Sequence, residues 1–308
     1  MSWRRLGQVY APDGARPWAC SHAALPVPVR IGPDSFRFFF STRDAEQRSH
    51  VGWVDLDIAE SPRVLQQASE PVLAPGEVGA FDDSGIGLGC LTDADDRMRL
   101  YYMGWNLGVG APWRNAIGLA SAPTVLDRFE RFSAGPIMDR SPEDPYTLSY
   151  PWVLRLGADD WWMWYGSNLA AHATRGDMKH VIKAARSRDG VRWQRDGATV
   201  IGFATPEEYA IARPTVVRLG DRLLMCFACR GERYRIGAAC STDGRSWLRL
   251  DTTFGLAPSA SGWDSEMTCY PALFWHRDRL WLAYNGNGYG RTGFGLAVWE
   301  GSLAAAAT

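Results

Sequence analysis

The hydrophobic and polar positions of this chain repeat in units of about sixty residues, which indicates a repeat architecture. In each unit a polar turn is followed by a short apolar stretch. That stretch ends in a large apolar or aromatic residue, and polar residues follow it. These end positions are 63, 62, 62 and 57 residues apart, and they are Phe40, Met103, Tyr165, Phe227 and Tyr284.

Two further features recur in the same register. A proline or glycine precedes each end position by 13 or 14 residues, at Pro26, Gly89, Pro151, Pro214 and Pro271. The third stretch of each unit is rich in glycine and alanine, and in two units it runs into near-identical Ser-x-Asp-Gly-x-x-Trp turns at 187–193 and 241–247. Asp-Gly supplies the positive φ that a tight hairpin needs, so these turns predict strand-to-strand connections.

The repeat predicts an all-β fold. Five units with about four short strands each predict a five-bladed β-propeller with four-stranded blades around a central funnel. We expect residues 1–308 to form a single domain, with residues 1 to about 20 supplying the last strand of the final blade. A β-sandwich with accidental periodicity is the alternative, and it does not account for five aligned units.

Composition and charge narrow the class of partner. The formal net charge of −1 argues against nucleic acid or an anionic membrane as a partner. No apolar run approaches a membrane span, and the first residues lack the apolar core of a signal peptide. We therefore expect a cytoplasmic protein whose partner is a small-molecule substrate, a sugar or another polar metabolite.

The six cysteines are scattered and lie mostly in apolar strand contexts, which is typical of reduced, buried thiols. Cys226 and Cys229 have the spacing of a metal-binding pair. On a strand, however, residues three apart point to opposite faces and cannot readily bind one ion. We predict no metal site and no cofactor.

The repeat pattern resembles the five-bladed glycosidase superfamily, on the early proline, the aromatic second strand, the Gly-Ala third strand and the Ser-x-Asp-Gly-x-x-Trp turn. That group includes glycoside hydrolase families 43, 32 and 68 and the family 130 mannoside phosphorylases. The resemblance covers nearly the whole chain and implies the fold, but the catalytic residues do not carry over. Leu25 stands where family 43 has an aspartate, and Ser149 stands where it has the general-acid glutamate.

Acidic residues before several inner strands are the candidates for catalysis, since glycoside hydrolysis needs two carboxyl groups on either side of the scissile bond. We predict Glu208 or Glu266 as the acid and Asp83 or Asp264 as its partner. Asp82 and Asp83 could also be turn residues that accept hydrogen bonds from backbone amides.

The candidates for substrate binding are polar or aromatic residues at strand ends and funnel entries. Arg213 is notable because it occupies the pre-proline position that Tyr150 and Tyr270 hold in their own units. The polar loop 168–177, with His172 and Arg175, is a candidate cover for the funnel. The predicted substrate-binding residues are His22, Arg43, Asp82, Trp105, Tyr150, Arg213, Arg230, Tyr270, Asn287 and Arg291.

Three functions follow from these observations. The first is a carbohydrate-active enzyme that cleaves or phosphorolyses a glycoside or sugar derivative by carboxylate acid/base chemistry in the funnel. The second is a propeller recruited to biosynthesis, with cyclisation, elimination, isomerisation or group transfer on a polar metabolite as its reaction. The third is a binding or scaffold propeller. The charged residues expected in the funnel argue against it.

Overall fold

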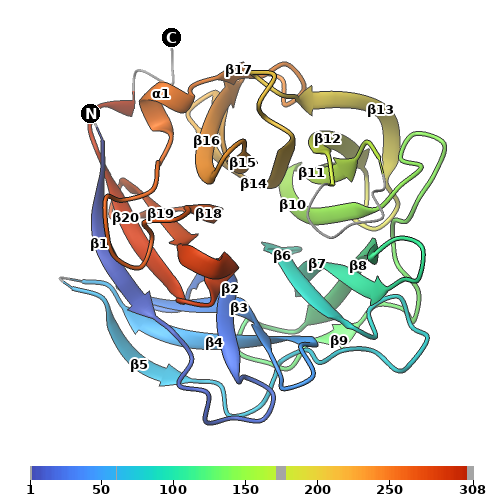
Figure 1. Ribbon diagram of the computed structural model, residues 1–308, viewed down its shortest axis with the longest axis horizontal. Helices are drawn as coiled ribbons and strands as arrows, with labels where there is room; N and C mark the ends of the chain where they lie inside the picture. The colour runs from blue at the N-terminus through green and yellow to red at the C-terminus, as the bar shows by residue number, and fades with distance from the viewer. Residues whose placement is uncertain (1, 60, 171–177, 304–308) are drawn as a thin grey trace.

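The computed structural model describes residues 2–59, 61–170 and 178–303. Figure 1 shows strands radiating in groups around a common centre, with the first strand β1 and the last strand β20 side by side. Residues 171–177, most of the predicted funnel cover, lie outside the described residues. The prediction of an all-β fold with its sheets arranged in blades is confirmed.

Two short helical turns and twenty strands make up the described chain. The turns are α1 (Asp251–Phe254) and η1 (Asn287–Gly290). The strands are β1 Ser2–Tyr10, β2 Ser21–Arg30, β3 Ser35–Arg43, β4 Ser49–Asp57, β5 Arg63–Gln67, β6 Gly85–Asp93, β7 Met98–Leu107, β8 Trp113–Ala122, β9 Glu130–Arg131, β10 Leu148–Gly157, β11 Asp160–Asn168, β12 His180–Ser187, β13 Gln194–Ile201, β14 Ala210–Leu219, β15 Arg222–Arg230, β16 Tyr234–Ser241, β17 Leu248–Arg249, β18 Cys269–His276, β19 Arg279–Asn285 and β20 Phe294–Glu300.

Consecutive strands pair antiparallel in meanders: β2 to β5, β6 to β9, β10 to β13 and β14 to β17. Single parallel bridges, Ser49 to Gly85 and His180 to Ala210, join these meanders in pairs. The strands therefore form three sheets, two of eight strands and one of four. The separation into isolated four-stranded blades that the sequence predicts is incomplete at these two bridges.

The N-terminal strand closes the ring, as the sequence predicts. β1 pairs antiparallel with β20, so the last sheet contains both ends of the fold in the order β1-β20-β19-β18. Trp3 anchors this strand. Its indole Nε1 donates to the carbonyl oxygen of Phe254 at 2.8 Å, and its ring packs edge-on against Trp299. Such a closure ties the two chain ends together through strand pairing.

The first strand of each meander faces the centre of the ring. These inner strands contact one another in a cycle, β2 with β6, β6 with β10, β10 with β14, β14 with β18 and β18 with β2. Each carries a β-bulge at the repeated proline or glycine, where the register with the second strand shifts. A bulge re-aims the side chains beside it, so this repeat directs side chains of all the inner strands to one place.

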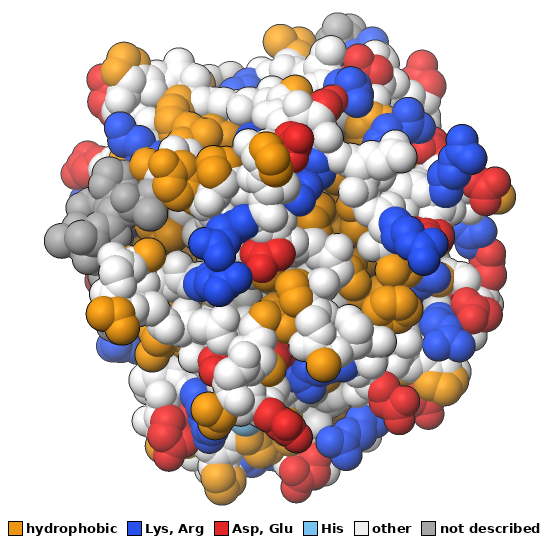
Figure 2. Space-filling view, turned by 90° about the vertical axis from the view of Figure 1, so that its right-hand side faces the viewer, with side chains coloured by type: hydrophobic (Ala, Val, Ile, Leu, Met, Phe, Trp, Pro, Cys, Tyr) orange, Lys and Arg blue, Asp and Glu red, His pale blue; other side chains and the backbone are white. Residues whose placement is uncertain are grey.

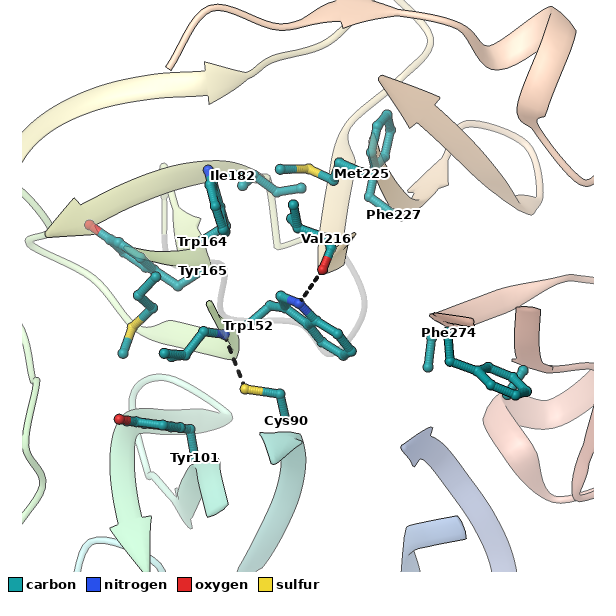
Figure 3. Close-up of a cluster of buried hydrophobic side chains, with 14 of the residues drawn as sticks. Cys90, Tyr101, Trp152, Trp164, Tyr165, Ile182, Val216, Met225, Phe227 and Phe274 are labelled. Carbon is teal, nitrogen blue, oxygen red and sulfur yellow. Dashed lines mark hydrogen bonds between the residues drawn. The ribbon is translucent and has the colours of Figure 1, made fainter. Parts of the chain in front are cut away.

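The core lies between neighbouring meanders and is rich in aromatic side chains. Figure 3 shows Trp152 between β6 and β14, where its Nε1 donates to the carbonyl oxygen of Val216 at 2.9 Å. On the other side of β10 the backbone N–H of Val153 donates to the Cys90 sulfur at 3.1 Å. A buried indole N–H needs such a partner, so these bonds fix how the inner strands stack.

The cysteines follow the prediction in part. Five of the six are buried and all six are free, whereas Cys20 is exposed. Cys226 and Cys229 belong to different hydrophobic clusters on opposite faces of β15, as their spacing predicts.

Basic and acidic side chains are interspersed on the face of the molecule seen in Figure 2. Within the described part of the chain, no helix is long and apolar enough to cross a membrane.

Candidate active site

A small pocket lies where the inner strands meet. Its lining comes from β2, β3, β4, β6, β7, β10, β18 and η1, and consists of His22, Ala24, Leu25, Ser41, Thr42, Arg43, Ser49, Ile86, Gly87, Met103, Trp105, Tyr150, Tyr270 and Tyr289. We call it the axial pocket. Its volume is about 70 Å³, below the ~300–1,000 Å³ usual for ligand sites. It therefore fits one small group of a ligand rather than a whole oligosaccharide.

The bulges hold the pocket residues in an unusual backbone conformation. The φ angles of Leu25, Tyr150, Arg213 and Tyr270, each just before a proline, are 60°, 40°, 55° and 51°. Non-glycine residues in the left-handed region cost ~1–3 kcal/mol each and cluster at functional sites. Here the strain turns four side chains from different inner strands toward the centre of the ring.

Two of these residues form a tyrosine pair across the pocket. The Tyr150 and Tyr270 hydroxyl oxygens are 3.4 Å apart, and the ring centroids are 5.5 Å apart. Burial raises the pKa of both hydroxyls. At neutral pH both therefore carry their protons and can act as hydrogen-bond or proton donors.

Positive charge collects beside His22 in the pocket lining. Burial, together with the charges of Arg43 and Arg291, lowers the pKa of His22 to about 4. His22 is neutral at pH 7, and its Nδ1 lies 2.9 Å from the Ser21 hydroxyl. Arg43, at the end of β3, is half-buried, and its guanidinium has no carboxylate partner among the described residues. Within the described ranges, the lining therefore offers a guanidinium without a carboxylate partner and a neutral imidazole.

Arg213 lies beside the tyrosine pair, without access to solvent. Its side chain is fully buried, and its Nη1 donates to the carbonyl oxygen of Gly89 at 2.6 Å. Burial lowers its pKa to about 10, and the Tyr150 and Tyr270 hydroxyls are among the groups that act on it. The guanidinium is therefore still charged at neutral pH.

An arc of aromatic rings continues from the pocket to its rim. The centroid of Tyr289 is 6.4 Å from that of Tyr270 and 5.8 Å from that of Tyr234. The Arg230 guanidinium then lies over the rings of Tyr234 and Tyr209, at 5.4 and 5.3 Å from their centroids. Arg230 is thus held by cation–π contacts at the rim.

Trp105 forms part of the lining, and its indole Nε1 donates to the Ser49 hydroxyl at 2.9 Å.

Asp83 lies in the nearby loop, where it accepts bonds from the Gly79 N–H, the Asn106 amide and the Ser84 hydroxyl. Burial alone would raise the pKa of Asp83, but these hydrogen bonds outweigh it and lower the pKa. These contacts stabilise the turn. They match the second interpretation of Asp83 in the sequence, a turn residue that accepts hydrogen bonds from the backbone.

Four other acidic residues before the inner strands share a different arrangement. Each is buried and pairs with an arginine on the outermost strand of its own meander or, for Asp264, with Arg5 on β1 of the last sheet. In most cases the hydroxyl of a second-strand tyrosine donates to it as well. We call these side chains the brace carboxylates, and they are Asp82, Asp144, Glu208 and Asp264.

Three of the brace carboxylates are predicted site residues. Asp82 accepts from the Tyr102 hydroxyl at 3.0 Å and from Arg131 Nε at 2.9 Å. Asp264 accepts from the Tyr284 hydroxyl at 2.9 Å, and Arg5 Nε lies 3.4 Å from it. Both therefore hold the inner, second and outer strands of one meander together.

Glu208 differs from the other brace carboxylates in its donors. Phe227 stands where their meanders have a second-strand tyrosine, and it cannot donate a bond. Arg235 and Arg249 bind the carboxylate instead, at 2.7 and 2.8 Å, together with the Ala204 N–H at 2.8 Å. Burial alone would raise the pKa of Glu208, but these donors lower it overall. A general acid needs a raised pKa, so this environment does not suit that role.

Three predicted residues, Glu266, Asn287 and Arg291, are not in the lining of the axial pocket; Asn287 begins η1 and the other two lie on loops. Glu266 is exposed, and its backbone N–H donates to Asn287 Oδ1 at 2.8 Å. Asn287 also donates to the carbonyl oxygen of Gly262, so it fastens the 262–266 loop. Arg291 is exposed and contributes positive charge near His22.

The structure thus separates the predicted residues into two groups. His22, Arg43, Trp105, Tyr150 and Tyr270 line the axial pocket, with Arg213 behind it and Arg230 at its rim. Among the residues that the structure describes, none of the predicted carboxylates belongs to the lining, namely Asp82, Asp83, Glu208, Asp264 and Glu266.

Sequence reasoning missed Tyr289 and the fourth brace, Asp144. The signal for Asp144 was present, because the brace carboxylates follow the repeat. They precede the second-strand aromatic residue by 19 to 21 residues in each unit. A residue that recurs in four units serves the fold of each, whereas a catalytic residue is needed once.

One cluster has the composition of a metal site. Ligand atoms of Glu208, Cys229 and Asp251 lie within 4.8 Å of one another. Arg249 binds both carboxylates, and burial raises the pKa of the Cys229 thiol to about 12. The protein's own guanidinium groups already neutralise the cluster, which is an ion-pair network.

A larger hollow, of about 310 Å³, lies along β12 and β13 and holds none of the predicted site residues. The Arg186 guanidinium lies 4.7 Å from the Trp162 ring centroid there.

Comparison with solved structures finds this fold elsewhere. A structure described as a glycoside hydrolase aligns with a TM-score of 0.75 at 16% identity, over 97% of this chain and 92% of that one. A thermostable family-43 glycoside hydrolase aligns with a TM-score of 0.69 at 12% identity, over 93% of each chain. A structure from work on the GH130 family of mannoside phosphorylases aligns with a TM-score of 0.71 at 13% identity, over 97% and 94%. The chain therefore has the fold of the glycoside hydrolase propellers, as the resemblance implied.

Comparison with known protein-family profiles gives no match. Two Mycobacterium tuberculosis proteins match over almost the full length, the uncharacterized protein MT1551 (strain CDC 1551 / Oshkosh) and the uncharacterized protein Rv1502 (strain ATCC 25618 / H37Rv). Each is 45% identical over 300 residues, which are 97% of this chain and 100% of the relative. The chain belongs to one family with these two mycobacterial proteins.

The bracing contact of Glu208 predicts a stability effect. Replacing Glu208 with Gln removes the buried carboxylate that Arg235 and Arg249 bind and leaves these two half-buried guanidinium groups only Asp251 as a counter-charge, so we expect the free energy of unfolding to fall by about 1–3 kcal/mol. The matched control is Glu207→Gln, next to it and exposed, which should change it by less than about 0.5 kcal/mol. Chemical denaturation measures both.

The pH dependence of this effect has a definite sign. The pKa of Glu208 is lowered in the folded state, so its contribution is complete above its unfolded pKa of about 4.3 and is lost as the pH falls below it. Equal stability of Glu208→Gln and wild type at pH 7 would contradict the bracing role.

The low pKa of His22 predicts a titration near pH 4 in an NMR experiment on the histidine ring. We expect Arg43→Gln to raise this pKa, because one of the two charges that lower it is removed. Arg48→Gln, on the exposed part of the same hairpin, should leave it unchanged. Because the unfolded chain takes up a proton first, His22 should also reduce stability as the pH falls from about 6.5 to about 4. A His22 pKa near 6.5 would show that the imidazole is solvated.

Proposed function

We propose that this protein is a carbohydrate-active enzyme, a single-domain five-bladed propeller that binds a sugar derivative at the axial pocket and transforms it there. The observation that carries the proposal is the convergence of strained inner-strand residues on a pocket lined by Trp105, the tyrosine pair, His22 and Arg43. Aromatic walls with a few fixed polar groups are the usual composition of a small-molecule site.

The shared fold supports the substrate class. The structures that align with this chain over more than nine-tenths of its length include a family-43 glycoside hydrolase and a protein of the mannoside phosphorylase family. In a propeller the axial end of the inner strands is the natural place for a ligand, because all the inner strands can contribute to it.

The tyrosine pair supplies the proposed chemistry. Both hydroxyls are protonated at neutral pH, and each is within reach of a group placed in the pocket. We propose that Tyr150 or Tyr270 donates a proton to a substrate oxygen, while the charges of Arg43 and Arg213 stabilise the negative charge that develops. General acid catalysis of this kind contributes about 10²–10⁴-fold to a rate.

The predicted carboxylates fall into two groups in this proposal. Asp82, Glu208 and Asp264 brace their strands and take no part in the reaction. Glu266 and Asp83 have no ion-pair partner among the described residues and are the remaining candidates for a hydrolytic acid/base pair. Hydrolysis or phosphorolysis through such a pair requires that one of them reaches the pocket.

A second candidate is favoured by the lining itself, in which the described residues include no Asp or Glu. A biosynthetic reaction such as an elimination, an isomerisation, a cyclisation or a group transfer on a polar metabolite needs a proton donor and anion stabilisation, and no carboxylate pair. Its products would keep all substrate atoms, lose only water or gain the transferred group.

Mass-spectrometric profiling tests both candidates. The purified protein would be incubated with a glycoside panel and a cell-extract metabolite pool, with and without phosphate. We expect turnover of a sugar derivative that falls by about 10²–10⁴-fold in Tyr150→Phe plus Tyr270→Phe. The Asp83→Asn plus Glu266→Gln variant should keep the wild-type rate.

The outcomes separate the candidates. Glycoside cleavage that is lost only in the carboxylate variant would replace the tyrosine mechanism with the carboxylate pair, and phosphate dependence would identify phosphorolysis. A product that keeps all substrate atoms, loses only water or gains a transferred group, with no glycosidic bond cleaved, would establish the second candidate. Sugar binding without any turnover would contradict an enzymatic function.

A further inference from the structure

Arg213 is a buried charge with no carboxylate partner among the residues that the structure describes. No part of the residue is exposed, and its Nε and Nη2 atoms have no hydrogen-bond partner in that part of the chain. Its side chain makes one hydrogen bond, from Nη1 to the carbonyl oxygen of Gly89, and its guanidinium carbon lies 5.5 Å from the centroid of the Trp152 ring. This bond and the cation–π contact compensate the charge only in part. Burial of a charge without a counter-ion is among the most costly arrangements in a protein interior. An anionic ligand that pairs with this guanidinium would offset that cost.

The contrast with another buried arginine is direct. Arg37 is 5% exposed and binds both oxygens of Asp55, at 2.8 and 2.9 Å. The groups whose charges act on Arg213 are Cys90, Tyr150 and Tyr270, and none of them is a carboxylate. At neutral pH all three are protonated and uncharged.

Resting on the proposed function, we propose that Arg213 binds an oxyanion carried by the sugar, a carboxylate or phosphate group, with the Tyr150 and Tyr270 hydroxyls as further donors. The substrate class of the axial pocket is then an acidic sugar derivative rather than a neutral glycoside.

The geometry suits such a group. The planar guanidinium offers two free donors in a fixed fork, which matches two oxygens of a carboxylate or phosphate. Tyr150 and Tyr270, whose hydroxyl oxygens are 3.4 Å apart, line the axial pocket, and both are close enough to Arg213 to act on its charge. In our proposal, an oxyanion bound by Arg213 also accepts hydrogen bonds from these hydroxyls. The pocket volume of about 70 Å³ also fits one small charged group.

Long-range charge favours the same ligand. Arg43 and Arg213 are the two cations that act on Tyr150, and Arg43 and Arg291 act on His22. No carboxylate acts on His22 or Arg213 within the described ranges. A ligand with a negative charge therefore enters a field that no acidic side chain of the described pocket offsets.

Titration calorimetry on the full-length protein tests the proposal with matched probes. Glucuronate and glucose 6-phosphate carry the oxyanion on a sugar, glucose lacks it, and inorganic phosphate presents it alone. We expect the two acidic sugars to bind the wild type more tightly than glucose. Arg213→Met should weaken their binding by about tenfold to a hundredfold, because charge-assisted hydrogen bonds are lost.

Two further variants keep the result interpretable. Arg218 lies on the same strand as Arg213 and is exposed. The Arg218→Met variant removes the same charge outside the site, so it should bind the acidic sugars as the wild type does. The Tyr150→Phe plus Tyr270→Phe variant leaves Arg213 in place and should bind them several-fold more weakly, so the proposal stays testable if Arg213→Met does not fold.

Each outcome has a definite meaning. Glucose binding as tightly as glucuronate, in the wild type and in Arg213→Met alike, would overturn the oxyanion site and leave the proposed sugar pocket standing. Inorganic phosphate binding through Arg213 while none of the sugars binds would keep the anion site, but it would overturn the sugar-borne oxyanion and the proposed function with it.

Discussion

The bulge at the pre-proline position of the inner strands is the constraint on which the site depends. An undistorted strand would alternate its side chains between its two faces and send only part of them to the centre of the ring. The four residues Leu25, Tyr150, Arg213 and Tyr270 have a left-handed backbone, and each is followed by a proline, whose φ is fixed by its ring. This conformation turns the side chain before the proline inward. Because the inner strands contact one another in a cycle, these side chains meet. The repeat that builds the fold therefore also builds the pocket, and the leucine, arginine and two tyrosines at the equivalent positions give it its chemistry.

The brace carboxylates explain how the frame tolerates this strain. In four meanders a loop carboxylate joins the inner strand to an arginine of the outermost strand, and the second strand usually contributes a tyrosine hydroxyl. Where Phe227 replaces the tyrosine, a second arginine compensates. These contacts place negative charge between strands and leave the arginines and tyrosines near the centre without acidic neighbours. The division of charge between a braced periphery and a cationic centre is the basis of the negative ligand that we propose for the axial pocket.

The repeat period allowed the arrangement of strands in blades and the closing N-terminal strand to be predicted, because each unit carries the same turn, proline and aromatic positions. The pocket residues at pre-proline positions followed from the same alignment. The catalytic residues did not, because acidity before an inner strand is shared by Asp82, Asp144, Glu208 and Asp264. Their common period marks them as members of the repeat, and only the structure shows the arginines that bind them. The tyrosine pair could not be predicted either. It joins positions 120 residues apart in sequence across the ring, and sequence periodicity does not show which units face each other.

The most direct test of this account is a crystal structure of the protein with an acidic sugar bound. The account predicts the sugar at the axial pocket, with its charged oxygens within hydrogen-bond distance of Arg213 Nε or Nη2 and of at least one hydroxyl of the tyrosine pair. A sugar bound beside Glu208 or Asp264, with their arginine partners displaced and Arg213 still without a partner, would contradict it.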